Sequence, residues 1–477
     1  MAVVLVVVAI VAVVAAIIAV HWYVWRRMVR DTTRPGGPAR RVGTMVVVLL
    51  PLVSFSATLS TRAEAPFTLQ RVLAWPGYLW LATLLYLVLA LIVGEAVRPL
   101  LTRFLARRDA ATAAPGGEPG PGAAQDPARD PVHTNTHTLA HEALPEPVTV
   151  PADAAASRPS ESLGSGHLES PSASAVASQG EAEPEAEVQP ERQPEPQPEP
   201  ESAVSRRLFV SRTVAVGAAA VAASTVGYGA YGVLRGPRVK RVTVPLAKLP
   251  RAAHGFRIAV VSDIHLGPIL GRGHAQRVVD AVNSTNPDLI TIVGDLVDGS
   301  VDNLRSAAEP LRGLRARHGS FFVTGNHEYF SGADEWVEHV RELGIHPLQN
   351  TRVELPAFDL AGVNDFAGED EDDGPDFAAA LGDRDRTRTS VLLAHQPVAI
   401  HDAVDFAVDL QLSGHTHGGQ LWPGNFVAEL ANPTVAGLER YRDTQLYVTR
   451  GAGAWGPPVR VGAPSDVTLV QLASRQA

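Results

Sequence analysis

The feature that most constrains this chain is an uninterrupted apolar run at its start, from Ala2 to Val20. At about 1.5 Å per residue, a helix of this length spans roughly 30 Å, the thickness of the hydrocarbon core of a bilayer. Aromatic residues and then Arg26 and Arg27 follow the run. A cleavable signal peptide instead places its positive charge before a shorter apolar region. The run therefore predicts a transmembrane helix over about residues 2–22.

Two more apolar runs, at residues 44–60 and 75–97, predict two further membrane helices within an N-terminal region of residues 1–108. Arginines are concentrated between the first two runs and after the third, whereas the loop between the second and third runs contains few. The positive-inside rule then places the N-terminus outside the cell and residue 100 in the cytoplasm. Buried helices of a large soluble core are the alternative, but such long runs without charge are unusual in water-soluble domains.

Residues 109–204 differ sharply in composition from the apolar runs. They contain no Phe, Trp or Tyr and end in a run rich in Glu, Pro and Gln. Such a segment buries too little apolar surface to offset the entropy lost on ordering. The composition predicts a disordered Pro/Glu/Ala-rich linker.

A fourth apolar region covers residues 205–236, where Arg206 and Arg207 precede a stretch rich in alanine and glycine. This pattern is compatible with a fourth transmembrane helix and with a twin-arginine-like signal anchor. Both interpretations place the rest of the chain outside the cytoplasm, although Arg238, Lys240 and Arg241 just beyond the stretch argue for the opposite orientation. We therefore expect a multi-pass protein of the cell membrane with an extracytoplasmic C-terminal domain.

Residues 242–477 alternate short β-branched runs with helical patterns, which predicts an α/β domain with one substantial core. Strands are predicted at residues 257–262, 288–293, 320–324, 358–363, 390–394, 408–412, 447–449 and 467–472. Helices are predicted at residues 274–286, 303–317 and 333–343.

Polar residues suited to metal binding or proton transfer follow five of these predicted strands. They are Asp263 and His265, Asp295 and Asp298, then Asn326, His327 and Glu328, then His395, and finally His415 and His417. A single histidine after a strand is more often an ordinary surface or hydrogen-bonded residue. Because ligands collect at the carboxyl ends of strands in open α/β sheets, five such clusters in one domain predict one shared site.

The types of these residues favour a site with two metal ions. Seven of the side chains can donate to a metal, which is more than one tetrahedral ion needs: Asp263, His265, Asp295, Asn326, His395, His415 and His417. The chain contains no cysteine, and oxygen and imidazole donors without sulfur favour Mn, Fe or Zn. Two divalent ions that share a carboxylate form an arrangement used to hydrolyse phosphate esters.

The series Asp-x-His, Gly-Asp-x-x-Asp, Gly-Asn-His-Glu, His and Gly-His-Thr-His-Gly-Gly-Gln resembles the calcineurin-like metallophosphoesterase superfamily. The following Leu-Trp-Pro and the membrane helices are similar to its membrane-associated bacterial branch. The resemblance covers about half of the chain. It implies a four-layer αββα sandwich with two mixed sheets, preceded here by the transmembrane helices and the linker.

The resemblance also implies roles for individual residues. Asp263, His265 and His417 would hold one metal ion, Asn326, His395 and His415 would hold the other, and Asp295 would bridge them. His327 would protonate the leaving oxygen or stabilise its charge. Asp298 is expected to contact a ligand residue or cap a turn rather than bind metal, and Glu328 has no assigned role.

These observations predict a membrane-anchored phosphoesterase that uses two divalent metal ions to hydrolyse a phosphodiester, phosphomonoester or pyrophosphate. The anchor favours a lipid-linked or envelope substrate. A nuclease or phosphoprotein phosphatase with the same site, or a membrane sensor without activity, are the alternatives. The formal net charge of −9 disfavours nucleic acid as a partner. The complete set of candidate ligands favours an enzyme over a sensor.

Overall fold

The structure is a computed structural model that describes residues 1–63, 65–112 and 201–476. Most of the predicted linker at residues 109–204 lies outside these residues, and the flanking helices extend into both of its ends. Four apolar helices come first: α1 (Ala2–Val24), continued by a π-helical segment (Trp25–Arg30), α2 (Pro38–Arg62), α3 (Phe67–Thr112) and α4 (Glu201–Leu234). Within the described residues, four helices are long and apolar enough to cross a membrane.

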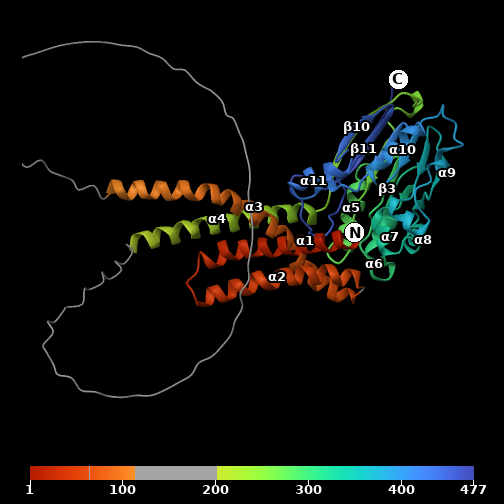
Figure 1. Cartoon of the computed structure of the whole chain (residues 1–477). Helices are drawn as coiled ribbons and strands as arrows, with labels where there is room; N and C mark the ends of the chain where they lie inside the picture. The colour runs from red at the N-terminus through yellow and green to blue at the C-terminus, as the bar shows by residue number, and fades with distance from the viewer. Residues whose placement is uncertain (64, 113–200, 477) are drawn as a thin grey trace, which may run out of the picture. The chain divides into compact units, whose positions relative to one another are not determined.

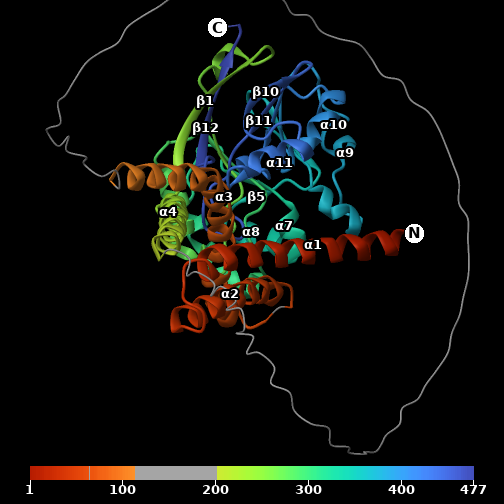
Figure 2. The ribbon, with the colours of Figure 1, turned by 60° about the vertical axis from the view of Figure 1, so that its left-hand side comes forward.

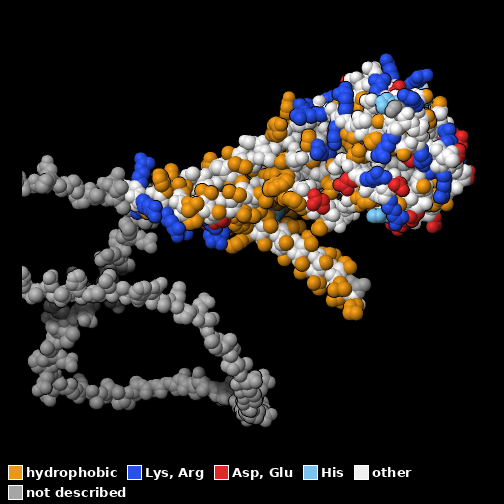
Figure 3. Space-filling model, turned by 90° about the horizontal axis from the view of Figure 1, so that it is seen from above, with side chains coloured by type: hydrophobic (Ala, Val, Ile, Leu, Met, Phe, Trp, Pro, Cys, Tyr) orange, Lys and Arg blue, Asp and Glu red, His pale blue; other side chains and the backbone are white. Residues whose placement is uncertain are grey.

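The end of α1 and residues of α2, α3 and α4 share one hydrophobic cluster, whereas the apolar run of α1 is exposed along its length. Many large side chains of the other helices also face outward. A Cβ added to Gly94 of α3 would come within 2.6 Å of Val214 of α4, so the glycine allows the two helices to approach. Figure 3 shows hydrophobic side chains along the helices and Lys and Arg side chains at one of their ends. Charged ends and an apolar middle are typical of helices that lie in a bilayer.

The α/β domain contains two six-stranded mixed sheets. The first has the order β1-β12-β2-β3-β4-β5 and the second the order β10-β11-β9-β8-β7-β6. The strands of the first sheet are β1 (Arg238–Leu246), β2 (Arg257–Val261), β3 (Leu289–Val293), β4 (Ser320–Val323), β5 (His346–Pro347) and β12 (Asp466–Ser474). Those of the second are β6 (Thr351–Glu354), β7 (Asp359–Gly362), β8 (Ser390–Leu393), β9 (Leu410–Ser413), β10 (Gly437–Tyr441) and β11 (Thr444–Val448).

Helices cover the outer faces of the two sheets, which gives the four layers expected from the sequence (Figures 1 and 2). The α-helices of the domain are α5 (Arg272–Asn283), α6 (Val301–Ala308), α7 (Asn326–Ser331), α8 (Ala333–Glu342), α9 (Phe377–Leu381), α10 (Ile400–Asp405) and α11 (Gly424–Ala431). Side chains alternate along each strand. Ile258 and Val260 of β2 therefore enter the core between the sheets, while Ala259 and Val261 pack in the cluster that contains α5.

Several elements differ from the sequence predictions. The helix predicted at residues 303–317 ends as an α-helix at Ala308, because Pro310 cannot continue it and a 3₁₀ turn follows. The strand β1 begins at Arg238, before the predicted domain start at residue 242, and pairs with β12 over its whole length. The short strands β5, β6 and β10 were not predicted. Each lies at the edge of a sheet and buries few side chains, so its sequence lacks the hydrophobic pattern of a strand.

The first helix of the domain, α5, buries a histidine. The side chain of His274 is almost inaccessible, and neither ring nitrogen has a hydrogen-bond partner among the described residues. Burial, followed by the charges of Arg277 and Arg460, lowers the pKa of His274 to about 3. The ring is therefore neutral in the folded protein at physiological pH.

This burial predicts a specific acid sensitivity. Unfolded chains protonate histidine near pH 6.5, whereas folded His274 resists protonation, so its contribution to stability is complete above pH 6.5 and decreases as the pH falls toward 3. The unfolding free energy of the native chain falls when the pH is lowered from 7 to 5. We expect this fall to be about 1–2 kcal/mol smaller in the His274→Phe variant. Unfolding measured at both pH values checks this, and equal losses in the two proteins would contradict it.

Candidate metal centre

The five predicted clusters meet because the strands before them end together. Asp263 and His265 follow β2, and their backbone amides donate to the carbonyl oxygens of Gly294 and Asp295 after β3, at 3.0 and 3.1 Å. The residues after β4, β8 and β9 reach the same region from both sheets. Close pairing of the loops thus brings side chains from distant parts of the sequence into one buried site.

The backbone at this site is strained. Asp263, His265, Asp295, His415 and His417 have φ angles of 51°, 49°, 52°, 71° and 53°, in the left-handed region that residues with a side chain seldom adopt. Each such residue costs about 1–3 kcal/mol, and strain of this kind clusters at functional sites. The loops therefore position these side chains at the expense of stability.

Two glycines of the predicted motifs allow the loops to approach one another. A Cβ added to Gly325 would overlap the carboxylate of Asp295, and one added to Gly414 would overlap Ser262 and the carboxylate of Asp263. Glycine is required at both positions because no larger residue fits beside these carboxylates.

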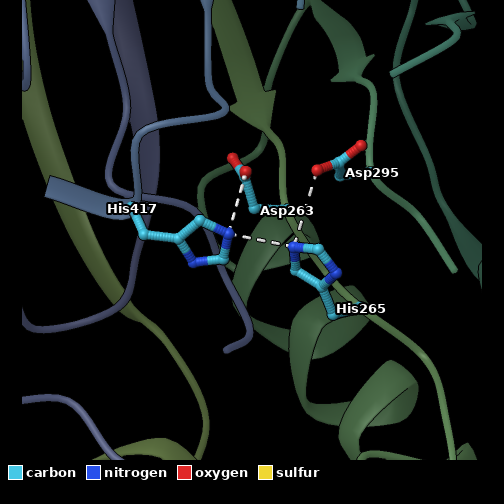
Figure 4. Close-up of side chains that lie close together, drawn as sticks. All are labelled: Asp263, His265, Asp295 and His417. Carbon is cyan, nitrogen blue, oxygen red and sulfur yellow. Dashed lines mark hydrogen bonds and ion pairs between the residues drawn. The ribbon is translucent and has the colours of Figure 1, made fainter. Parts of the chain in front are cut away.

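Asp263, His265, Asp295 and His417 form a buried group whose donor atoms point toward one another (Figure 4). The Nε2 atoms of His265 and His417 lie 2.9 Å apart. The Nε2 of His417 lies 3.3 Å from a carboxylate oxygen of Asp263, and the Nε2 of His265 lies 3.7 Å from one of Asp295. Such convergence of carboxylate and imidazole donors is the pattern of a metal site.

Asp298 lies beside this group and contacts two histidines. Its Oδ1 is 2.8 Å from the Nδ1 of His265 and 2.8 Å from the Nδ1 of His327. Burial alone would raise the pKa of Asp298, but His265 and His327 lower it to about 2. Burial alone would lower the pKa of His327, but the hydrogen bond to Asp298 and the charges of Asp295 and Asp298 raise it to about 9. Asp298 thus orients both rings.

His395, His415 and Asp295 form a second group of possible ligands. The Nε2 of His395 lies 3.2 Å from a carboxylate oxygen of Asp295, and the Nδ1 of His415 lies 3.0 Å from the side-chain oxygen of Asn326. Asp295 therefore faces both groups. The nine residues to which the sequence assigned a role all lie in or beside this cluster: Asp263, His265, Asp295, Asp298, Asn326, His327, His395, His415 and His417.

Comparison with known proteins agrees with this geometry. The profile of the calcineurin-like phosphoesterase family matches residues 256–419. The chain is 40% identical over 259 residues to the transmembrane protein with metallophosphoesterase domain of Danio rerio. The matched residues make up 51% of this chain and 59% of that protein. It is 37% identical over 247 residues to a metallophosphoesterase of Helicobacter pylori strain J99, with 51% and 66% covered. The chain thus spans less than two thirds of the length of these two relatives.

A shorter relative decides the family. The chain is 33% identical over 245 residues to a metallophosphoesterase of Aquifex aeolicus and covers 91% of that protein. The chain belongs to the calcineurin-like phosphoesterase family. Members of this family depend on metal ions, and the Danio rerio relative is named as a transmembrane protein, which together with the four apolar helices indicates membrane association.

The residues of this family member fit a metal ion. The Nδ1 of His395 donates to the carbonyl oxygen of Val293 at 2.9 Å, so in the neutral ring the Nε2 presents a lone pair toward Asp295. This Nε2 is buried and has no hydrogen-bond partner among the described residues. Burial alone would lower the pKa of His395, but Asp295 raises it well above its ordinary value. A proton and a metal ion therefore compete for the same lone pair.

The sequence assigned no role to two residues of the site. Glu328 was noted but given no role. Its buried carboxylate accepts the backbone amides of Asp295, Leu296 and Gly325 at 2.9, 2.8 and 2.6 Å. Burial and then the charge of Asp295 raise the pKa of Glu328 to about 7, while the amides of Gly325 and Leu296 oppose this shift. Glu328 therefore fastens the loop after β3 to the loop after β4.

Arg460 is the second such residue, and no motif marks it. Its guanidinium donates to the Nδ1 and the carbonyl oxygen of His417 at 2.9 and 2.8 Å. Burial and then the charge of Arg460 lower the pKa of His417 well below its ordinary value, so this ring is neutral. With Nδ1 as acceptor, the neutral ring carries its proton on Nε2, which faces the Nε2 of His265.

The three hydrogen bonds of Glu328 predict a large effect of a small change. In Glu328→Gln, an NH₂ group replaces one carboxylate oxygen. This NH₂ group cannot accept a hydrogen bond from the backbone N–H that faces it. We expect a loss of about 2–4 kcal/mol of unfolding free energy. Unfolding of this variant is compared with that of Glu335→Gln, at an exposed position of α8. Equal stability of the two variants would contradict the role of Glu328.

Proposed function

We propose that this protein is a membrane-anchored hydrolase of phosphate esters that uses two divalent metal ions in an extracytoplasmic active site. The main support is the presence of two groups of possible metal donors, buried except for the half-buried His415, that share Asp295. The number of donors exceeds what one ion needs. The absence of sulfur donors favours Mn, Fe or Zn.

In this proposal Asp263, His265 and His417 would hold one ion, and Asn326, His395 and His415 would hold the other. Asp295 faces both groups and would contribute its carboxylate to both sites. Two bound divalent ions would supply positive charge for the phosphoryl oxygens and would activate water at neutral pH. Strained loops fastened by Glu328 would keep the donors in place before substrate binds.

His327 is the residue best placed to move a proton. Its side chain is 15% exposed, and its Nδ1 is held by Asp298 at 2.8 Å. The backbone amide of His327 donates to Asp295 Oδ1 at 3.0 Å, which keeps the residue beside the metal donors. Hydrolysis adds water to phosphorus and breaks the ester P–O bond. In our proposal the Nε2–H of His327 protonates the leaving oxygen or stabilises its charge.

The topology of the apolar helices supports an outward-facing domain. Arginines lie at the end of α1, the start of α2, the end of α3 and the start of α4, so four crossings place all of these ends on the cytoplasmic side. Ala218 and Ala222 of α4 pack in a cluster with residues of α3, as expected for a permanent fourth helix rather than a removable signal.

The basic residues after α4 no longer oppose this orientation. Arg238, Lys240 and Arg241 belong to β1, a strand of the folded domain. The charges of large domains contribute little to orientation, because such domains are translocated largely regardless of charge. An anchored outward site favours a lipid-linked or envelope phosphate ester as substrate.

Two substitutions separate proton transfer from metal binding. We expect His327→Ala to retain both metal ions and to lose about 10²–10⁴-fold in turnover, because it removes only the proton donor. Asp295→Asn is expected to lose metal and turnover together, because it weakens both groups of donors. Metal content and hydrolysis of bis(p-nitrophenyl) phosphate are measured for both variants. The control is His346→Ala, at an exposed position of β5. Full activity in either test variant would refute these roles.

The orientation can be tested with single cysteines, because the chain contains none. Asp383→Cys introduces a thiol at a side-chain position that is 81% exposed on the α/β domain. Arg34→Cys introduces one between α1 and α2. In intact cells we expect a membrane-impermeant maleimide to label position 383 and not position 34. Labelling of position 383 only after permeabilisation would exclude an extracytoplasmic domain.

A further inference from the structure

The helix α11 is apolar and yet covers no core. None of its residues is buried, and Phe426, Val427 and Leu430 are 58%, 68% and 87% exposed. Trp422, just before the helix, is 51% exposed. Figure 1 shows α11 at the margin of the α/β domain. A helix at a water-facing surface normally turns its apolar side toward a core, so α11 requires another apolar environment.

The segment just before α11 and the segment around Arg460 are both attached to the apolar helices. The hydroxyl of Tyr86 in α3 donates to the carbonyl oxygen of Trp422 at 2.9 Å. Val459 is fully buried in a cluster that includes Ala222 and Val226 of α4. The backbone amide of Arg460 donates to the carbonyl oxygen of Gly229 in α4 at 3.3 Å. The chain that leads into α11 is thus held against the helices that we assign to the membrane.

The depth of this contact follows from the length of α3. Tyr86 lies eleven residues before Val97, where the apolar run of α3 ends and Arg98 begins the cytoplasmic side. At about 1.5 Å per residue this is roughly 17 Å, within the 30 Å or so of a hydrocarbon core. The backbone of Trp422 accepts a hydrogen bond from Tyr86 and therefore lies at the same depth in the bilayer. Phe426 and Leu430 follow within one short helix.

The same segment leads directly into the metal centre. The start of α11 packs on Gly419, two residues after His417, so closely that a Cβ on Gly419 would overlap Asn425. The side chain of Gln420 donates to the carbonyl oxygen of Trp455 at 2.8 Å and accepts its backbone amide at 3.0 Å. Trp455 is 59% exposed, and its ring lies 5.7 Å from that of His327.

Phe330 completes the apolar border of the site. Its side chain is 74% exposed, and its ring lies 5.6 Å from that of His327. Exposed aromatic rings beside a catalytic histidine suit the apolar part of a substrate rather than a free phosphate ester. Tryptophan is moreover the residue that most prefers the membrane interface.

We propose that α11 and Trp422 insert into the outer leaflet of the bilayer that holds the four helices, and that the site hydrolyses amphiphilic phosphate esters from that leaflet. This inference rests on the proposed function and names its class of substrate. The phosphate reaches the metal centre past Trp455 and Phe330, while the acyl chains remain among the lipids around α11.

The insertion can be measured without substrate. Leu430→Cys is labelled with an environment-sensitive nitrobenzoxadiazole dye, and the full chain is reconstituted into phosphatidylcholine vesicles with brominated acyl chains. We expect quenching similar to that of a dye at Leu81→Cys, an exposed apolar position of α3, and none at Asp383→Cys. Absence of quenching at position 430 would overturn the proposal. Burial of α11 against a second copy of the chain would also overturn the proposal. In that case the dye at position 430 would be shielded from water to a degree that depends on protein concentration, and the brominated lipids would not quench it.

The substrate class is tested with two probes that release the same p-nitrophenol. One is soluble bis(p-nitrophenyl) phosphate, and the other is hexadecyl p-nitrophenyl phosphate presented in vesicles. We expect the double variant Phe426→Ser/Leu430→Ser to lower the ratio of lipid-probe to soluble-probe turnover about tenfold, and Glu429→Gln on the same helix to leave it unchanged. An unchanged ratio in the double variant would overturn this inference, whereas hydrolysis of neither probe by the native chain would instead refute the proposed function.

Discussion

Burying several carboxylates close together is the constraint on which the rest of this structure depends. Asp263, Asp295 and Glu328 are almost inaccessible to water and lie within one set of adjoining loops. Uncompensated, such charges would cost more than the whole stability of a domain. The protein compensates Glu328 with three backbone amides and surrounds the two aspartates with imidazoles. Bound cations would complete the balance of charge.

The two sheets make this arrangement possible because their strands deliver residues to a common edge. The core between the sheets is apolar, so the polar residues are confined to the strand ends. This separation explains why the candidate site could be predicted from the sequence. Each candidate ligand stands just after a strong strand pattern, and the glycines beside Asn326 and His415 mark the tight approach of the loops.

Other parts could not be predicted, for physical reasons. The role of Glu328 depends on the neighbouring loop after β3, which local sequence does not reveal. Arg460 lies in an irregular segment, far in sequence from the histidine that it contacts. The strand β1 begins with basic residues that resembled a membrane flank, and it gains its apolar contacts only by pairing with β12. The helix α11 has no core-facing pattern because its apolar residues face away from the protein.

We propose that a dinuclear metal centre built from these loops hydrolyses phosphate esters. The most direct test measures divalent metal by inductively coupled plasma mass spectrometry and phosphodiester hydrolysis in the same preparation of the full chain. The account predicts about two ions per chain, loss of hydrolysis when a chelator removes them, and recovery when Mn²⁺ is added. Hydrolysis that persists in metal-free protein, or an active enzyme that holds one ion per chain, would contradict it.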